Sequence, residues 1–288
     1  MKPRRRSDRS EHMRNIIKIS IPETVDTIQR GAFQGCRKLL NINLPNGLNK
    51  IDDATFCWCS SLESIELPDG ISEIGKEAFQ GCTVLKDINV SEGITIGKSA
   101  FQRCRNLADR EGFVIRNGIL FGYYGTNSCV TIPKGIHTIN DKAFDGFEGV
   151  LIESIVIPED VKKIGYAAFS NQGELNNIII ENPSVELESW AFYGCNSLAD
   201  DEGWIIVRDT LFGYCGNRHD VYVPKRVKKI SSFSRKEEYN VLKLHIPAYI
   251  DEIYGIMGGE NGVWIVGEKG STAEKYAEKN HIRFVNES

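Results

Sequence analysis

The sequence repeats a frame of 23 residues, and this repeat constrains the fold more than any other feature. It is clearest in three apolar-proline pairs, Ile21-Pro22, Leu44-Pro45 and Leu67-Pro68, since 45 − 22 and 68 − 45 both equal 23. Each copy then carries Val, Leu or Ile three positions after the proline, followed by Ile, by Ala or Thr with Phe, and by Cys and Leu. Six further copies, nine in all, begin near Ile88, Val130, Ile155, Ile178, Val221 and Leu244.

A period of this length predicts a solenoid, because one repeat cannot bury its own apolar face whereas stacked repeats can. In Ile65-Glu66-Leu67 the alternation predicts a short strand with one buried side, and the following proline ends it. The apolar spacing in residues 74–85 predicts one or two helical turns on the far side of the coil. We therefore expect an α/β solenoid, a right-handed coil with a parallel β-sheet on one face.

A second period of 91 residues overlies the first. Cys104 and Cys195 are separated by this interval, as are the segments 107–113 and 198–204. We interpret residues 108–129 and 199–220 as two hairpin insertions into the solenoid. The first contains Asn117-Gly118, a strong hairpin signal, and the second has the weaker turn Arg208-Asp209 in its place.

The pattern predicts one continuous solenoid over residues 16–262. In residues 1–15 the run Arg4-Arg5-Arg6 is followed by polar residues, whereas a secretion signal would continue with an apolar core. Residues 1–15 are interpreted as a disordered basic and polar arm, with a localisation or interaction tag as the alternative. Residues 263–288 are expected to form a strand–helix cap, whose helix starts with the capping-box pattern of Ser271 to Glu274. With no signal peptide or anchor, the chain as written is expected to be cytoplasmic.

The frame I-x-I/L-P-x-x-V-x-x-I-x-x-x-A-F-x-x-C-x-x-L resembles the BspA-like branch of the leucine-rich repeats, from about Ile16 to Phe284. Both insertions and the ending Gly270–Ala277 also resemble that family. The resemblance implies a leucine-rich-repeat coil in a bacterial or protozoan protein. It also implies a cell-surface or secreted location and adhesion to host or matrix proteins. The family defines no catalytic residues that could be carried over.

No pattern in the sequence indicates a catalytic, cofactor or metal site. Five of the eight cysteines share one frame position, where a thiol behaves as a small buried apolar group: Cys36, Cys59, Cys82, Cys104 and Cys195. The five histidines lack the spacing of metal ligands, and no nucleophile elbow or phosphate loop occurs. A net charge of -4 favours neither nucleic acid nor an acidic membrane, and no apolar run is long enough to insert into a membrane. We predict a non-enzymatic protein without a cofactor.

The exposed strand position of each copy offers the candidate binding surface. Its residues, in chain order, are Ser20, Asn43, Glu66, Asn89, Thr131, Val156, Ile179, Tyr222 and His245. The last four would form an interface centre, walled by Trp204 and Tyr214 of the second insertion. Strand propensity alone also explains Val, Ile and Tyr here. A protein partner is expected, and the alternative is a glycan stacking on Tyr222, Tyr123, Tyr214 and Trp204.

Overall fold

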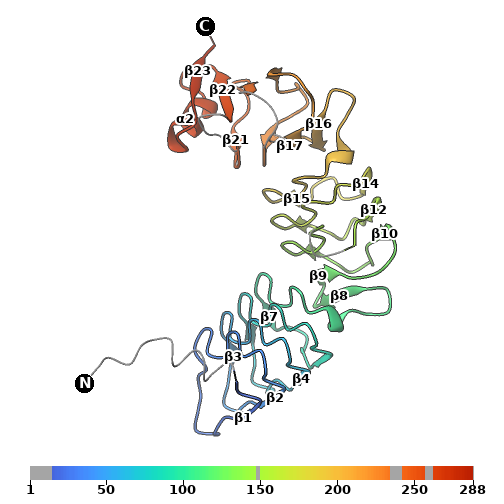
Figure 1. The fold of residues 1–288 in the computed structure, drawn as a ribbon, viewed down its shortest axis with the longest axis vertical. Coiled ribbons are helices and arrows are strands. Elements are labelled where there is room, and N and C mark those ends of the chain that lie inside the picture. The colour runs from blue at the N-terminus through green and yellow to red at the C-terminus, as the bar shows by residue number, and fades with distance from the viewer. Residues whose placement is uncertain (1–14, 147–149, 234–241, 257–261, 288) are drawn as a thin grey trace, which may run out of the picture. The chain divides into compact units, whose positions relative to one another are not determined.

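A computed structural model describes residues 15–146, 150–233, 242–256 and 262–287 (Figure 1). The chain divides into two compact units: unit 1 comprises residues 1–126 and 135–143, and unit 2 comprises residues 127–134 and 144–288. The described residues form a parallel β-solenoid of about 11 turns with little helix. Residues 1–14 of the predicted arm lie outside the described residues.

The first strand of each turn lies where the apolar-proline frame predicts it. Unit 1 contains β1 (Lys18–Ser20), β2 (Asn41–Asn43), β4 (Ser64–Ile65) and β6 (Asp87–Ile88). Unit 2 contains β10 (Cys129–Thr131), β12 (Ser154–Ile157), β14 (Asn177–Ile180), β18 (Asp220–Tyr222), β20 (Leu242–His245), β22 (Val263–Gly267) and β23 (Phe284–Asn286). The pairs are parallel and equivalent residues face one another, so Ile155 lies between Val130 and Ile178. Stacking equivalent residues buries the same apolar position in every turn.

Most turns also contribute a second strand, usually of two residues, so the described residues carry two rows of parallel strands where one sheet was expected. Unit 1 contains β3 (Lys50–Ile51), β5 (Glu73–Ile74), β7 (Thr95–Ile96), β9 (Ile119–Tyr123) and β11 (Thr138–Ile139). Unit 2 contains β13 (Lys163–Ile164), β15 (Glu186–Leu187), β17 (Thr210–Tyr214), β19 (Lys229–Ile230) and β21 (Glu252–Ile253). Most of these strands begin with a charged or polar residue followed by a buried Ile or Leu. Two residues of opposite character are enough to place one side chain outside and the next in the core.

The helical turns predicted for residues 74–85 are not found, and the α/β description is wrong in this respect. Glu77 and Gly81 have φ values of 59° and 76°, and a left-handed residue stops an α-helix. The amides of Ala78, Gln80 and Cys82 each donate to the carbonyl three residues earlier and so close four-residue turns, whereas those of Glu77, Phe79 and Gly81 donate to carbonyls of the next solenoid turn. The backbone thus satisfies its hydrogen bonds between turns as well as within them. Besides one α-helix, the described residues contain two single 3₁₀ turns, Arg105–Leu107 and Asn196–Leu198.

A ladder of phenylalanine rings fills the core of each unit. In unit 1 the rings of Phe33, Phe56, Phe79 and Phe101 stack with centroid distances of 5.5, 5.4 and 5.5 Å. In unit 2 the rings of Phe144, Phe169 and Phe192 stack at 4.9 and 5.1 Å. Rings packed at these distances in every turn contribute both apolar burial and aromatic contact.

The frame cysteines lie beside this ladder as free thiols. The Sγ atoms of Cys59, Cys82 and Cys104 donate to the carbonyl oxygens of Phe33, Phe56 and Phe79, at 3.1, 3.1 and 3.0 Å. Burial raises the pKa of the Cys59 and Cys104 thiols to about 12, so they stay protonated at neutral pH. All eight cysteines are described, and none forms a disulfide.

The protein is therefore expected to fold without disulfides and to show two reactive thiols. Cys129 and Cys215 are exposed and should react within seconds with a thiol reagent in the native protein, whereas the six buried thiols should react slowly. Denatured, non-reduced protein should titrate eight thiols, and the melting temperature should not change with reductant. Two or more intact disulfides among the frame cysteines would contradict this expectation.

Residues 108–129 and 199–220, interpreted from the sequence as hairpin insertions, each contain an antiparallel pair of strands. β8 (Phe113–Arg116) pairs with β9, and β16 (Trp204–Val207) pairs with β17, each with an irregular register in the middle. Two glycines lie in close contact at the base of each pair. A Cβ on Gly112, whose φ is 95°, would lie 2.1 Å from the backbone nitrogen of Gly125, and Gly203 meets Gly216 in the same way at 2.5 Å. These glycines allow the backbone just before the first strand of each pair to contact the backbone just after the second strand.

Replacing Gly112 by alanine is expected to destabilise the protein more than replacing Gly35 by alanine. Both glycines have positive φ, so both substitutions carry about 1–2 kcal/mol of backbone strain. Gly35 has open space around its Cβ position, whereas Gly112 adds an overlap with backbone that cannot move aside. Denaturant unfolding of the two variants measures the difference, and equal stabilities would contradict the close contact.

The C-terminal residues contain α2 (Thr272–Lys279), which packs against β22 and β21. The helix begins at Ser271, whose side chain accepts a hydrogen bond from the amide of Glu274, and Glu274 accepts in turn from the amide of Gly270. This reciprocal cap satisfies amides that the first helical turn leaves open. Ala273 and Ala277 are buried against the last solenoid turns. β23 then pairs parallel with β22.

Candidate binding surface

The exposed strand position in unit 2 is apolar where β12 and β14 pair. Val156 lies directly beside Ile179 on the outer face, because Ile155 and Ile157 on either side point into the core. Ile179 is 48% exposed, a large fraction for an aliphatic side chain in a strand. Val156 is half-buried. The two side chains form a small apolar area open to solvent.

Tyr222 of β18 and His245 of β20 lie side by side on the outer face of a second sheet. Their residues pair in register, and their rings stack with centroids 3.9 Å apart and planes inclined by 20°. Tyr222 is 63% exposed, whereas His245 is only 9% exposed. The tyrosine ring therefore covers the imidazole and presents its own outer surface to solvent.

His245 is held in place by two carboxylates. Its Nε2 lies 2.6 Å from Oδ1 of Asp220, and its Nδ1 lies 2.9 Å from Oε1 of Glu287. Because the two contacts fix the ring from opposite ends, the imidazole is a rigid support beneath Tyr222.

Trp204 and Tyr214 do not wall the surface, which corrects the expectation from the sequence. They are 4% and 5% exposed, and their rings contact each other at 4.7 Å as a cross-strand pair of β16 and β17. Phe113 and Tyr123 form the equivalent buried pair of the first insertion at 4.9 Å. Each aromatic pair fills its hairpin's inner side, so three of the four proposed glycan platforms are inside the protein.

Trp264 of β22 lies in the same sheet as Tyr222 and His245, one strand beyond His245, and its outward position was not predicted from the sequence. It pairs with Lys243 in register, and the guanidinium of Arg283 lies 3.6 Å from the centroid of its ring. Aligning Val263-Trp264-Ile265 with the alternation of β20 would have placed it outward. We call the residues Tyr222, His245, Trp264, Asp220 and Glu287 the Tyr222 patch. β14 and β18 lie in different sheets, so Ile179 is not paired with this patch.

The sequence matches the BspA type leucine rich repeat region in 6 copies, over residues 10–112, 115–202 and 147–256. The chain belongs to the BspA-type leucine-rich repeat family. The expected resemblance is thereby confirmed, and Val156, Ile179, Tyr222 and His245 lie within the matched residues, whereas Trp264 and Glu287 lie beyond them. No curated protein matches the sequence.

Three solved bacterial structures are similar to this BspA-type protein. A leucine rich cell surface protein from Faecalibacterium prausnitzii is 19% identical, with a TM-score of 0.44 over 80% of this chain and 69% of that chain. A leucine-rich repeat protein from Bacteroides ovatus is 22% identical, with a TM-score of 0.41 over 89% of this chain and 64% of that chain. The pneumococcal vaccine antigen PcpA is 19% identical, with a TM-score of 0.47 over 94% of this chain and 79% of that chain.

The described residues hold no group of three or more His, Cys, Asp or Glu side chains arranged to bind a metal ion. In the same part of the chain, no helix has the length and apolar character needed to cross a membrane. The chemistry that the surface does offer is an exposed aromatic ring, aliphatic side chains and fixed charges.

Proposed function

We propose that this protein is a non-enzymatic module that binds a protein partner through the outer strand face of unit 2, in an adhesin-like or scaffold role. The observation that carries the proposal is the Tyr222 ring, which is exposed yet fixed by its stack on His245. A rigid aromatic ring loses little conformational entropy when a partner covers it. Tyr is also among the residues that contribute most to protein interfaces.

The surroundings of Tyr222 support a protein partner further. Ile179 and Val156 add apolar area at the equivalent strand position of another sheet in unit 2, and the ion pair of Asp220 and Lys243 supplies both charges on the strands that carry Tyr222 and His245. An apolar centre with a charged rim is the usual composition of a protein interface. Strand propensity alone would explain Tyr at this position. It does not explain why the tyrosine ring stacks on an imidazole that two carboxylates hold in place.

A photo-crosslinking amino acid placed at position 222 tests this proposal. Incubated with extracts of candidate host cells or of the producing cell, it should yield defined protein adducts on irradiation. The same group at Asn43, an exposed residue of the equivalent strand position in unit 1, is the matched control. Adducts equal in identity and yield at both positions would show that the Tyr222 patch is not the binding surface.

A glycan is the second candidate, and one feature of unit 1 favours it. A groove of about 690 Å³ lies over the polar strand row and is lined by Asn41, Asn43, Asn89, Glu23 and Glu66 among others. Amide and carboxylate side chains are good hydrogen-bond partners for hydroxyl groups. A glycan array with the intact protein distinguishes the two candidates: strong array binding that is lost in Asn43→Ala and retained in Tyr222→Ala would favour the glycan.

A further inference from the structure

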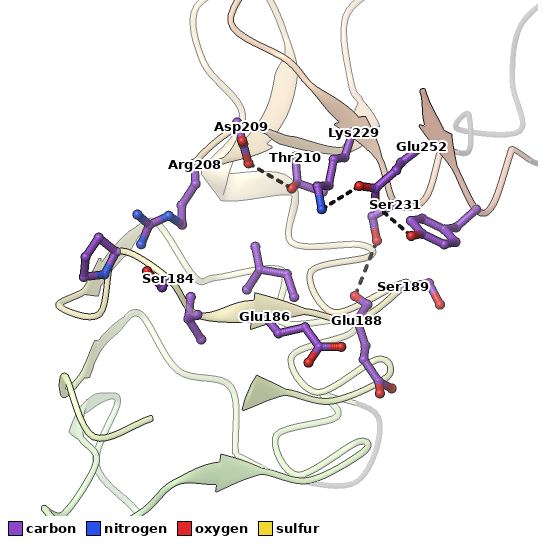
Figure 2. Close-up of a pocket in the computed structure, with 14 residues that line it drawn as sticks. Ser184, Glu186, Glu188, Ser189, Arg208, Asp209, Thr210, Lys229, Ser231 and Glu252 are labelled. Atoms are coloured by element: carbon purple, nitrogen blue, oxygen red, sulfur yellow. Dashed lines mark hydrogen bonds and ion pairs between the residues drawn. The ribbon is translucent and has the colours of Figure 1, made fainter. Parts of the chain in front are cut away.

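A pocket of about 640 Å³ opens in unit 2 away from the Tyr222 patch, where the second row of strands is interrupted (Figure 2). One wall is the segment 183–189, which contains β15. The other wall consists of side chains from β17, β19 and β21, including Thr210, Lys229, Glu252 and Tyr254. The pocket thus lies between two sets of strands that belong to separate sheets.

β15 presents an open edge to this pocket. It is the last strand of its sheet, and the amides of Glu186 and Glu188 donate to the carbonyls of Lys162 and Ile164 in the preceding turn. Since alternate residues of a parallel strand bond to opposite neighbours, the N–H and C=O of Leu187 point to the other side, where Leu187 lines the pocket. Such an edge is a ready template for another extended segment.

Two contacts bridge the pocket at either end of this edge. Nη1 of Arg208, at the tip of the β16–β17 hairpin, donates to the carbonyl of Asn182 at 2.7 Å. Oγ of Ser231 lies 3.4 Å from the carbonyl of Glu188, as the dashed line in Figure 2 marks. Between these two contacts the walls of the pocket stay apart. The core beneath the pocket is nevertheless continuous, because the ring of Phe192 packs edge-on against that of Phe212 with a centroid distance of 5.2 Å. The open edge is therefore part of a folded, tightly packed region.

The charge of the pocket favours a basic occupant. Its lining residues include four carboxylates, Glu186, Glu188, Asp209 and Glu252, and the two cations Arg208 and Lys229. Lys163 beside the pocket pairs with both Glu186 and Glu188, so four carboxylates face three cations and one negative charge remains in excess. The hydrogen bond from Lys229 lowers the pKa of Glu252, so that carboxylate is ionised at neutral pH. The side chain of Glu186 is 66% exposed and is 3.6 Å from the ammonium of Lys163.

We propose that this pocket binds a short extended peptide segment carrying lysine or arginine, which adds as a strand to the open edge of β15. Main-chain hydrogen bonds to Leu187 would provide affinity, and basic side chains at alternate positions would face the carboxylates. This site is separate from the Tyr222 patch, and its occupant need not be the partner that binds there.

The test uses capped hexapeptides with lysine at alternate positions and varied apolar residues between them, titrated into the intact protein by calorimetry and by amide hydrogen exchange. Binding should slow the exchange of the Leu187 amide. N-methylation of the peptide's alternate amides should weaken binding about tenfold, because it removes main-chain hydrogen bonds. Glutamate in place of lysine should abolish binding, and Tyr222→Ala should leave it unchanged.

A matched pair of variants localises the effect. Glu186→Gln should weaken binding about two- to fivefold, the range of an exposed ion pair. Glu73→Gln should have no effect, because β5 has the same frame position but pairs on both sides, with β3 and β7. Unchanged exchange at Leu187, equal binding of the N-methylated peptides, or no binding by any hexapeptide at millimolar concentration would overturn the proposal.

Discussion

Replacing Phe79 by alanine is expected to lower the free energy of unfolding by about 3–5 kcal/mol. The ring is fully buried in unit 1 and stacks between Phe56 and Phe101 at 5.4 and 5.5 Å. Truncation removes the apolar area of the ring and leaves a cavity that the neighbouring turns cannot fill without breaking their hydrogen bonds. It also removes two ring contacts, one on each side. Urea or guanidinium unfolding monitored by circular dichroism measures the change.

Glu66→Ala is the control for this substitution. Glu66 directly follows β4 in the same unit and is exposed, so its truncation should change stability by no more than about 0.5 kcal/mol. A solenoid can unfold in parts, so the comparison requires that both variants show the same m-value, the slope of the unfolding free energy against denaturant concentration. Equal denaturation midpoints would mean that Phe79 does not occupy the core position of the frame.

The parallel solenoid could be predicted because its signal is repeated. An apolar residue such as Ile65 or Ile88 recurs at one frame position, and stacking places these residues opposite each other in β4 and β6. A repeat of this kind fixes both the strand and its register, since a shift by one residue would expose the whole apolar set. The family resemblance rested on the same residues and is confirmed.

The far side of the turns could not be predicted from spacing alone. Apolar residues three and four positions apart fit an α-helix, but they fit a series of tight turns equally well. What decides between them is the left-handed backbone at Glu77, and at its counterparts Ala54 and Ser99 in the neighbouring turns. These are not glycines, so the sequence gives no direct sign of positive φ. Hydrogen bonds to the next turn compensate the strain, and they exist only in the stacked structure.

The candidate surface stays a proposal, and what the sequence does predict of it is the direction in which its strand residues point. Strand alternation gives the direction of a side chain, and Ile179 and Tyr222 do point outward. It does not reveal what covers a side chain, and His245 is covered by Tyr222 and by Glu287, 42 residues further along the chain. Trp204 and Tyr214 were expected outside because they are aromatic residues of an insertion. They face each other across a hairpin, where a large apolar pair is most stable when buried.

Replacing Tyr222 by alanine is expected to weaken binding of the partner identified by crosslinking by about 2 kcal/mol or more, which is roughly thirtyfold in Kd. The ring is the most exposed aromatic group of the patch and is held in place by its stack on His245, so alanine removes a contact area that is already rigid before binding. Tyr222→Phe should retain most of the affinity, because the apolar ring stays. Ile179→Asp should also weaken binding, since it places a charge in the apolar area.

The matched controls are Asn43→Ala and Glu66→Ala, which lie at the same frame position in unit 1 and are exposed. All variants are first compared by circular dichroism and thermal melting, so that a loss of binding is not a loss of fold. Surface plasmon resonance then gives Kd for each, and the effect should appear mainly in the dissociation rate. Because unit 1 offers polar side chains in place of an aromatic anchor, its two variants should bind like the native protein. Weaker binding of Asn43→Ala and Glu66→Ala alone, with Tyr222→Ala and Ile179→Asp unaffected, would indicate that the interface lies in unit 1.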